Sequence, residues 1–115
     1  MSLNRIYEVL ISLGLSQTDA RIYIFLASKG SKKARQIIQD LKINKQQLYR
    51  SLKRLRNKKI IYTSVGTPAL FIAEPFDKTI RMLMNNKKKQ AKVIEEKKTN
   101  LLSLWDSFDL ENNNT

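Results

Sequence analysis

One side of a predicted helix over residues 45–58 carries side chains that can hydrogen-bond to the edges of bases. On a helical wheel, Leu48, Leu52 and Leu55 form an apolar stripe, and the opposite side holds only Gln, Asn, Arg and Lys. Arg can make paired hydrogen bonds to guanine, and Gln or Asn to adenine, so these residue types suit a helix that enters a major groove. They are Gln46, Gln47, Arg50, Lys53, Arg54 and Asn57.

The sequence lacks the residues that most catalytic and metal sites use. It contains no His and no Cys, which excludes disulfides, zinc sites built on those residues, Cys nucleophiles and acid–base catalysis by His. It also has no Gly-rich phosphate loop and no nucleophile elbow. We therefore expect a binding protein rather than an enzyme, with no cofactor and no metal site.

Positive charge is concentrated in the same part of the chain. The 115 residues include 22 Lys and Arg against 10 Asp and Glu, a formal net charge of +12. Residues 31–62 contain 11 of the basic residues and one acidic residue, Asp40. Because this segment also carries regularly spaced Ile and Leu, we expect a folded positive face, whose natural partner is a polyanion.

Gly residues mark the ends of the first predicted elements. Helical spacing of apolar residues predicts a helix over residues 3–13, which Gly14 ends, and a central helix that runs from Ser16 to Gly30. Ser16 and Asp19 have the spacing of a capping box, in which both side chains accept hydrogen bonds from free N–H groups. The chain length suits one compact domain.

A helix-turn-helix pattern followed by a hairpin occupies the middle of the chain. A third helix from Ser31 and a fourth over residues 45–58, capped by Asn44, are joined by a short connection. Residues 60–64 and 69–73 are predicted strands, joined by a turn at residues 65–68. The order predicts a mainly α fold with a small β-hairpin, in which residues 1–75 form a winged helix-turn-helix DNA-binding domain.

After Pro75 the sequence predicts one long helix over residues 76–110, with residues 111–115 expected to fray. Its apolar residues recur at alternating spacings of three and four, as in a coiled-coil seam with a polar middle. Since residues 1–75 cannot cover such a helix, we expect it to pair with a second copy in a homodimer. The candidate interface residues are Ile80, Leu83, Ile94, Leu101, Leu104, Trp105 and Phe108.

The candidate DNA contacts divide by role. Bases are usually read from the first half of a recognition helix, which here contains Gln46, Gln47 and Arg50. Free N–H groups and basic side chains at the start of the preceding helix suit phosphates. The phosphate candidates are Ser31, Lys32, Lys33, Arg35, Lys45, Lys53, Arg54 and Asn57. The hairpin turn has no Arg or Lys, so wing contacts would come from Ser64, Gly66 and Thr67.

Two stretches of the sequence resemble the TrmB-type archaeal transcriptional regulators. Residues 13–23, LGLSQTDARIY, resemble the opening motif of that family, and residues 44–55, NKQQLYRSLKRL, resemble its recognition helix. The resemblance covers residues 3–75 and implies a winged-helix fold, dimerisation and operator DNA as ligand. Lys59 stands where the family usually has Gly, which implies a less sharp helix end. Larger members carry a sugar-binding domain after this region, whereas this chain has a helix, so no small-molecule effector is expected.

The favoured hypothesis is a cytoplasmic transcriptional regulator that binds duplex operator DNA as a homodimer, with one recognition helix in each major-groove half-site. The alternative is a winged-helix module that binds RNA or assembles a protein complex. A rigid basic helix suits the B-form major groove better than the narrow groove of A-form RNA. A metal-dependent nuclease would need an acidic cluster near the basic face, which the sequence lacks. No signal peptide or membrane-spanning segment is predicted, so no membrane partner is expected.

Overall fold

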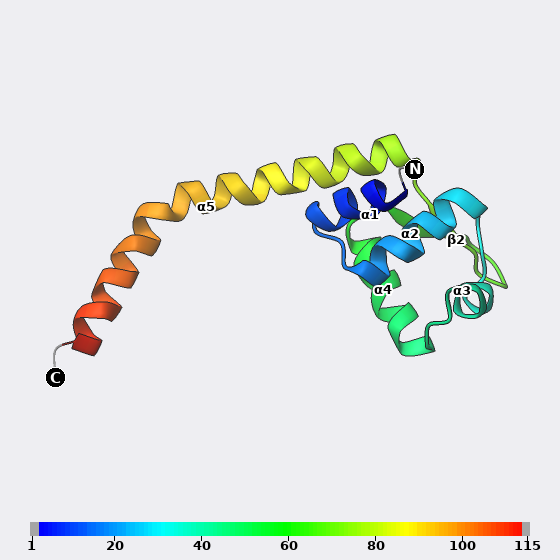
Figure 1. The fold of residues 1–115 in the computed structure, drawn as a ribbon, viewed down its shortest axis with the longest axis horizontal. Helices are drawn as coiled ribbons and strands as arrows, with labels where there is room; N and C mark the ends of the chain where they lie inside the picture. Colours follow the sequence, from blue (N-terminus) through cyan, green and yellow to red (C-terminus); the bar gives the residue numbers. More distant parts are fainter. Residues whose placement is uncertain (1–2, 114–115) are drawn as a thin grey trace. The chain divides into compact units, whose positions relative to one another are not determined.

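The structure is a computed structural model that describes residues 3–113 (Figure 1). Its elements are α1 (Leu3–Ser12), α2 (Gln17–Lys29), α3 (Ala34–Leu41), α4 (Lys45–Asn57), β1 (Ile61–Thr63), β2 (Phe71–Ala73) and α5 (Phe76–Asn113). The chain divides into two compact units, one ending at Met84 and one beginning at Asn85. None of the helices in the described range is long and apolar enough to cross a membrane.

Helix α2 lies at the centre of the first unit, as its apolar residues on most sides predict. It contacts α1, α3, α4 and β2, and Ala20, Ile22 and Tyr23 are fully buried. The hydroxyl of Tyr23 donates a hydrogen bond to the carbonyl oxygen of Glu74 at 2.7 Å, which satisfies the one polar atom of this side chain. The central helix is therefore tied to the segment that follows the wing.

A short turn joins α3 to α4. Lys42 ends α3 in the left-handed region at φ 54°, and Ile43 packs into the core below the turn. Asn44 then caps α4, because its side-chain oxygen accepts from the backbone N–H of Gln47 at 2.8 Å. In return the side-chain oxygen of Gln47 accepts from the backbone N–H of Asn44 at 3.1 Å. This reciprocal capping box fixes the first turn of α4.

The wing is an antiparallel pair in which Ile61 faces Ala73 and Thr63 faces Phe71. Both strands are shorter than the sequence predicts. The far side of β2 pairs with Lys32, whose backbone exchanges hydrogen bonds with Phe71 at 2.8 and 3.2 Å. Because this pairing keeps residues 31–33 extended, α3 begins at Ala34 and the predicted helix start at Ser31 is wrong.

Helix α4 ends more sharply than the resemblance implied. Its last helical residue is Asn57, and Lys59 takes the left-handed conformation at φ 62°. The backbone N–H of Ile60 then returns to the carbonyl of Leu55 at 3.2 Å. Lys59 therefore adopts the left-handed conformation that Gly favours at the end of a helix, although it is not Gly.

The first two turns of α5 belong to the first compact unit, which ends at Met84 and is called the winged unit below. Thr79 and Leu83 are fully buried, and Ile80 packs against the core. The assignment of Leu83 to a dimer interface is therefore wrong, because the same three-and-four spacing also serves packing within one chain. Ile80 is only partly buried and stays a candidate for the interface.

The far end of α5 is longer than expected. The helix continues to Asn113 instead of fraying from Glu111. Asn112 donates to the carbonyl of Phe108 at 2.8 Å, and Asn113 donates to the carboxylate of Asp109 at 2.9 Å. These side chains bond to the preceding turn and extend the helix; residues 114–115 lie outside the described range.

An ion pair between a buried Asp and a half-exposed Arg joins α2 to α4. Asp19 is 1% exposed, and Arg54 donates to its two oxygens from Nε and Nη2, each at 2.9 Å. Nη2 also donates to Ser51 at 3.0 Å. The Ser16 hydroxyl accepts from the backbone N–H of Asp19 at 3.1 Å, as predicted, but the Asp19 carboxylate bonds Arg54 rather than capping α2.

The pair keeps Asp19 charged. Burial alone would raise the pKa of the carboxyl group, but hydrogen bonds from Arg54 and Ser51, together with the positive charge of Arg54, lower it below its ordinary value of 3.8. A depressed pKa means that the pair stabilises the fold above pH 3.8, and that this contribution is lost as the pH falls through the lowered pKa.

Arg54→Ala should leave the buried carboxylate of Asp19 without its partner and lower the free energy of unfolding. The expected loss at pH 7 is about 1–3 kcal/mol, less than for a wholly buried pair because Arg54 is half exposed. The loss should shrink as the pH falls below 3.8 and Asp19 takes up a proton.

Urea denaturation followed by circular dichroism measures both effects. Arg56→Ala is the matched control, since Arg56 lies on the same helix, is exposed and makes no side-chain hydrogen bond within residues 3–113. An equal loss for both variants, or a loss independent of pH, would show that the pair does not stabilise the fold.

Candidate nucleic-acid interface

The outward side of α4 presents the residue types that the sequence predicted. Leu48, Leu52 and Leu55 are fully buried against the core. On the opposite side four candidates are exposed and make no side-chain hydrogen bond within the described residues, so their polar groups are available to a ligand. They are Gln46, Arg50, Lys53 and Asn57.

Gln47 is placed differently from its neighbour Gln46. Its side-chain oxygen is bonded to Asn44 in the capping box, so it cannot offer that oxygen to adenine without giving up the cap. Its side-chain amino group remains a donor. The pattern Asn-x-x-Gln at the start of a helix is the signal that could have predicted this structural role.

Arg54, expected as a phosphate contact, is held by Asp19. Two of its guanidinium nitrogens are bonded to the carboxylate, and its side chain is 46% exposed at the edge of the face. The carboxylate of Asp19 neutralises the positive charge of Arg54, which would otherwise attract a phosphate. Its contribution to the site in this structure is to position α4 against α2.

The extended segment before α3 and the first turn of α3 carry the next group of phosphate candidates. Ser31, Lys33 and Arg35 are exposed, and Lys32 is half buried by its pairing with β2. The backbone N–H of Lys33 is bonded to the side chain of Gln36 at 3.1 Å. Because this N–H group is already bonded, the groups near the start of α3 that could bind a phosphate are mainly the cationic side chains. Lys45, at the start of α4, is exposed as well.

The wing contributes a compact turn. The Ser64 hydroxyl accepts from the backbone N–H of Leu70 at 2.9 Å, and the Ser64 N–H donates to Leu70 in return, so Ser64 closes the hairpin. Gly66 takes a positive φ of 120°, and Thr67 is exposed beside it. The part of the wing free to meet a ligand is therefore the turn itself.

Sequence reasoning missed a second basic group at the end of α4. Arg56 and Lys59 border a shallow hollow of about 420 Å³ that continues along β1 past Tyr62 and Thr63. Glu74 on its other side is paired with Lys78 at 3.2 Å. The signal was present, because both residues belong to the basic segment 31–62.

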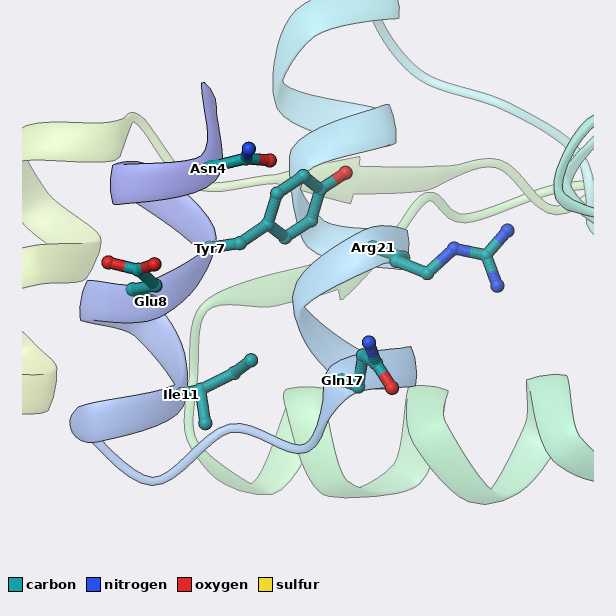
Figure 2. Close-up of a pocket in the computed structure, with 6 residues that line it drawn as sticks. All are labelled: Asn4, Tyr7, Glu8, Ile11, Gln17 and Arg21. Carbon is teal, nitrogen blue, oxygen red and sulfur yellow. The ribbon is translucent and has the colours of Figure 1, made fainter. Parts of the chain in front are cut away.

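Another hollow of about 420 Å³ lies between α1 and α2 (Figure 2). Asn4, Tyr7 and Glu8 line it from α1, and Gln17 and Arg21 from α2. Figure 2 shows Glu8 and Arg21 directed away from each other, and Arg21 donates to the carbonyl of Leu41 at 2.8 Å. The charged groups do not converge, and Arg21 serves to join α2 to the end of α3.

Comparison with known proteins supports the interpretation of the fold. The chain is similar to a MepR-like protein whose crystal structure was determined in complex with pseudoligands. The TM-score is 0.54 at 13% sequence identity, and the match covers 96% of this chain and 84% of that chain. At this identity the likeness concerns the fold alone. Among curated protein sequences no significant match is found.

The family comparison is more specific. A family model described as "Sugar-specific transcriptional regulator TrmB" matches residues 10–77. This range runs from the end of α1 through the helix-turn-helix and the wing to the start of α5. Because the match extends over more than half of the sequence and the fold agrees with it, the chain belongs to the TrmB family of transcriptional regulators.

Proposed function

We propose that the protein regulates transcription by binding duplex operator DNA as a homodimer, with α4 of each copy in a major-groove half-site. The observation that carries the proposal is the exposed side of α4, where Gln46 and Arg50 have uncommitted hydrogen-bonding groups. They lie in the first half of the helix, from which bases are usually read.

The roles within the interface follow from what each side chain is free to do. Gln46 and Arg50 are the base readers, since they are free and project from the start of α4. Gln47 assists by capping the helix through its side-chain oxygen, and its amino group remains a donor for the ligand. The phosphate contacts are Ser31, Lys32, Lys33, Arg35, Lys45, Lys53 and Asn57, and Arg54 acts by holding α4 to α2. Gly66 and Thr67 are the wing contacts, and Ser64 shapes the turn.

Duplex DNA is favoured over RNA by the shape of the reader. A helix fits the major groove of B-form DNA, whereas the corresponding groove of A-form RNA is too narrow to admit side chains. Proteins that bind single strands stack successive bases on aromatic side chains, whereas the large exposed aromatic residues of the winged unit, Tyr49, Tyr62 and Phe76, lie on three different elements.

The homodimer is supported by α5. In the described part of the chain beyond Asn85, no residue is buried, and Ile94, Leu101, Leu104, Trp105 and Phe108 are all more than half exposed. A helix with apolar residues in water gains stability when a second helix covers them. Two copies would hold two recognition helices for two half-sites, which multiplies their affinities.

Competition experiments test the proposal. Duplex sites selected from random DNA should be palindromic and should outcompete duplex RNA of the same sequence. If a dimer neutralises 6–10 phosphates, the logarithm of the binding constant should fall against the logarithm of salt with a slope of about −5 to −9. Equal binding of RNA and DNA, or selection without a consensus, would favour the RNA-binding or assembly alternative.

Arg50→Ala and Lys33→Ala should separate base reading from phosphate binding. Arg50→Ala should cost about 1–3 kcal/mol per half-site on the selected sequence and little on random DNA. Lys33→Ala should weaken binding to both and flatten the salt dependence by about one unit for each phosphate that the variant no longer neutralises. Fluorescence anisotropy at several salt concentrations measures both; equal effects of Arg50→Ala on the two sequences would show that Arg50 binds a phosphate.

Gln46→Ala and Gln47→Ala form a second matched pair, since they are neighbours of the same residue type. Gln46→Ala should reduce discrimination between bases without changing the free energy of unfolding. Gln47→Ala should lower that free energy by about 0.5–1 kcal/mol through removal of the cap, and weaken binding to all sequences. If Gln47→Ala altered sequence preference at unchanged stability, its role would be that of a base reader.

A further inference from the structure

The segment of α5 from Asn85 to Asn113 combines exposed apolar side chains with charged side chains that form no ion pair within the described residues. Its large apolar side chains are between 47% and 68% exposed, and the rings of Trp105 and Phe108 lie 5.4 Å apart. They are Val93, Ile94, Leu101, Leu102, Leu104, Trp105, Phe108 and Leu110. None of the ion pairs found in residues 3–113 lies in this segment.

Charge is divided between the two ends of the segment. Lys87, Lys88, Lys89 and Lys92 lie at the start, where residues 85–94 contain no acidic side chain. Asp106, Asp109 and Glu111 lie at the far end, where residues 99–113 contain no basic side chain. We name these the basic end (residues 87–92) and the acidic end (residues 106–111). One helix therefore carries opposite charge at its two ends.

We propose that α5 pairs antiparallel with α5 of a second copy, so that the basic end of each helix lies beside the acidic end of the other. This inference rests on the homodimer proposed above and adds its orientation. The axes of paired helices lie about 8–10 Å apart. This spacing does not exceed the distance at which physiological salt screens exposed charges, about 8–10 Å, so charged side chains on the two helices interact across the pair.

Parallel pairing is disfavoured by the same charges. It would bring four lysines beside four lysines at one end and three carboxylates beside three carboxylates at the other. Charges that flank an apolar seam set the orientation of paired helices, and like charges brought together oppose pairing. Only the antiparallel arrangement replaces both repulsions with attraction.

The charges also give the register. If the middle of the basic end lies level with the middle of the acidic end, the two-fold axis passes near Thr99. Ile94 then lies level with Leu104 of the second copy, and Lys89 with Asp109. A shallow hollow lined by Lys89, Gln90, Val93 and Ile94 lies level with the Trp105–Phe108 ring pair of that copy. Apolar and charged residues are thus matched by one alignment.

Distances between single spin labels distinguish the orientations, and the absence of Cys makes single-site labelling clean. Labels at Asn85→Cys should lie about 42 Å apart in the antiparallel pair, from 28 residues at about 1.5 Å per residue. In a parallel pair they would be about 10–20 Å apart. Ser103→Cys is the matched control, since it lies near the axis and should give about 15 Å in either orientation.

The outcomes separate this inference from the proposed homodimer. A long distance from Asn85→Cys with a short one from Ser103→Cys supports antiparallel pairing. Short label distances from both variants would overturn the antiparallel orientation but would still support a dimer that pairs through α5. Long or undefined distances from both, or a full-length chain that sediments as a monomer at tens of micromolar, would overturn pairing through α5.

Reversal of the acidic end gives an independent measurement. The triple variant Asp106→Lys, Asp109→Lys and Glu111→Lys should weaken self-association about tenfold or more at low salt, with the difference shrinking as salt rises. Self-association should be restored when the basic end of the same chain is also reversed, by Lys87→Glu, Lys88→Glu, Lys89→Glu and Lys92→Glu. All these residues are exposed, so the winged unit keeps its fold, which circular dichroism checks. Unchanged self-association of the triple variant would overturn the antiparallel arrangement.

Discussion

The bidentate contact between Arg54 and Asp19 determines how the recognition helix is held. Asp19 lies buried on α2, the central helix, and Arg54 lies one turn beyond Arg50 on α4. Because residues four positions apart lie on neighbouring parts of a helix surface, fixing Arg54 also fixes the direction in which Arg50 projects. The cap formed by Asn44 and Gln47 holds the opposite end of α4. The reading side is thus defined at both ends by polar contacts, and along its length by the buried leucines.

The same contact offsets one positive charge of the basic segment, residues 31–62. Like charges in residues 31–62 repel one another and oppose the compact state, yet they are also what attracts a polyanion. Asp19 comes from outside this segment and places one carboxylate beneath its surface. Its lowered pKa keeps it ionised throughout the physiological range. The protein therefore reduces repulsion at a point where the charge supports the fold, and leaves Arg50 and Lys53 free where the charge faces a ligand.

Local patterns predict the helices and the reading side, because periodicity and caps depend on residues within one or two turns. The leucine stripe of α4 and the cap at Asn44 are of this kind. The features that local patterns miss depend on contacts distant in sequence. Asp19 and Arg54 are 35 positions apart, and Lys32 is kept extended by pairing with Phe71. The spacing of Leu83 predicts a coiled-coil position, but residues buried within one chain recur at the same spacing, and Leu83 is one of these. Gln47 is different, since its capping role is visible in the sequence but its residue type also suits base reading.

Helix α5 serves two kinds of packing along one continuous element (Figure 1). Thr79 and Leu83 are buried in the winged unit, whereas every described residue from Asn85 onward is exposed. A helix without tertiary packing is marginal in water, so the stability of this segment and its association with a partner form one equilibrium. If the second copy is the partner, association also orders the helix that connects two recognition units. Operator affinity then depends on the fraction of chains that are paired, because one unit alone gains nothing from the second half-site. The charges at the ends of α5 would act on DNA recognition through this equilibrium, without contacting the DNA.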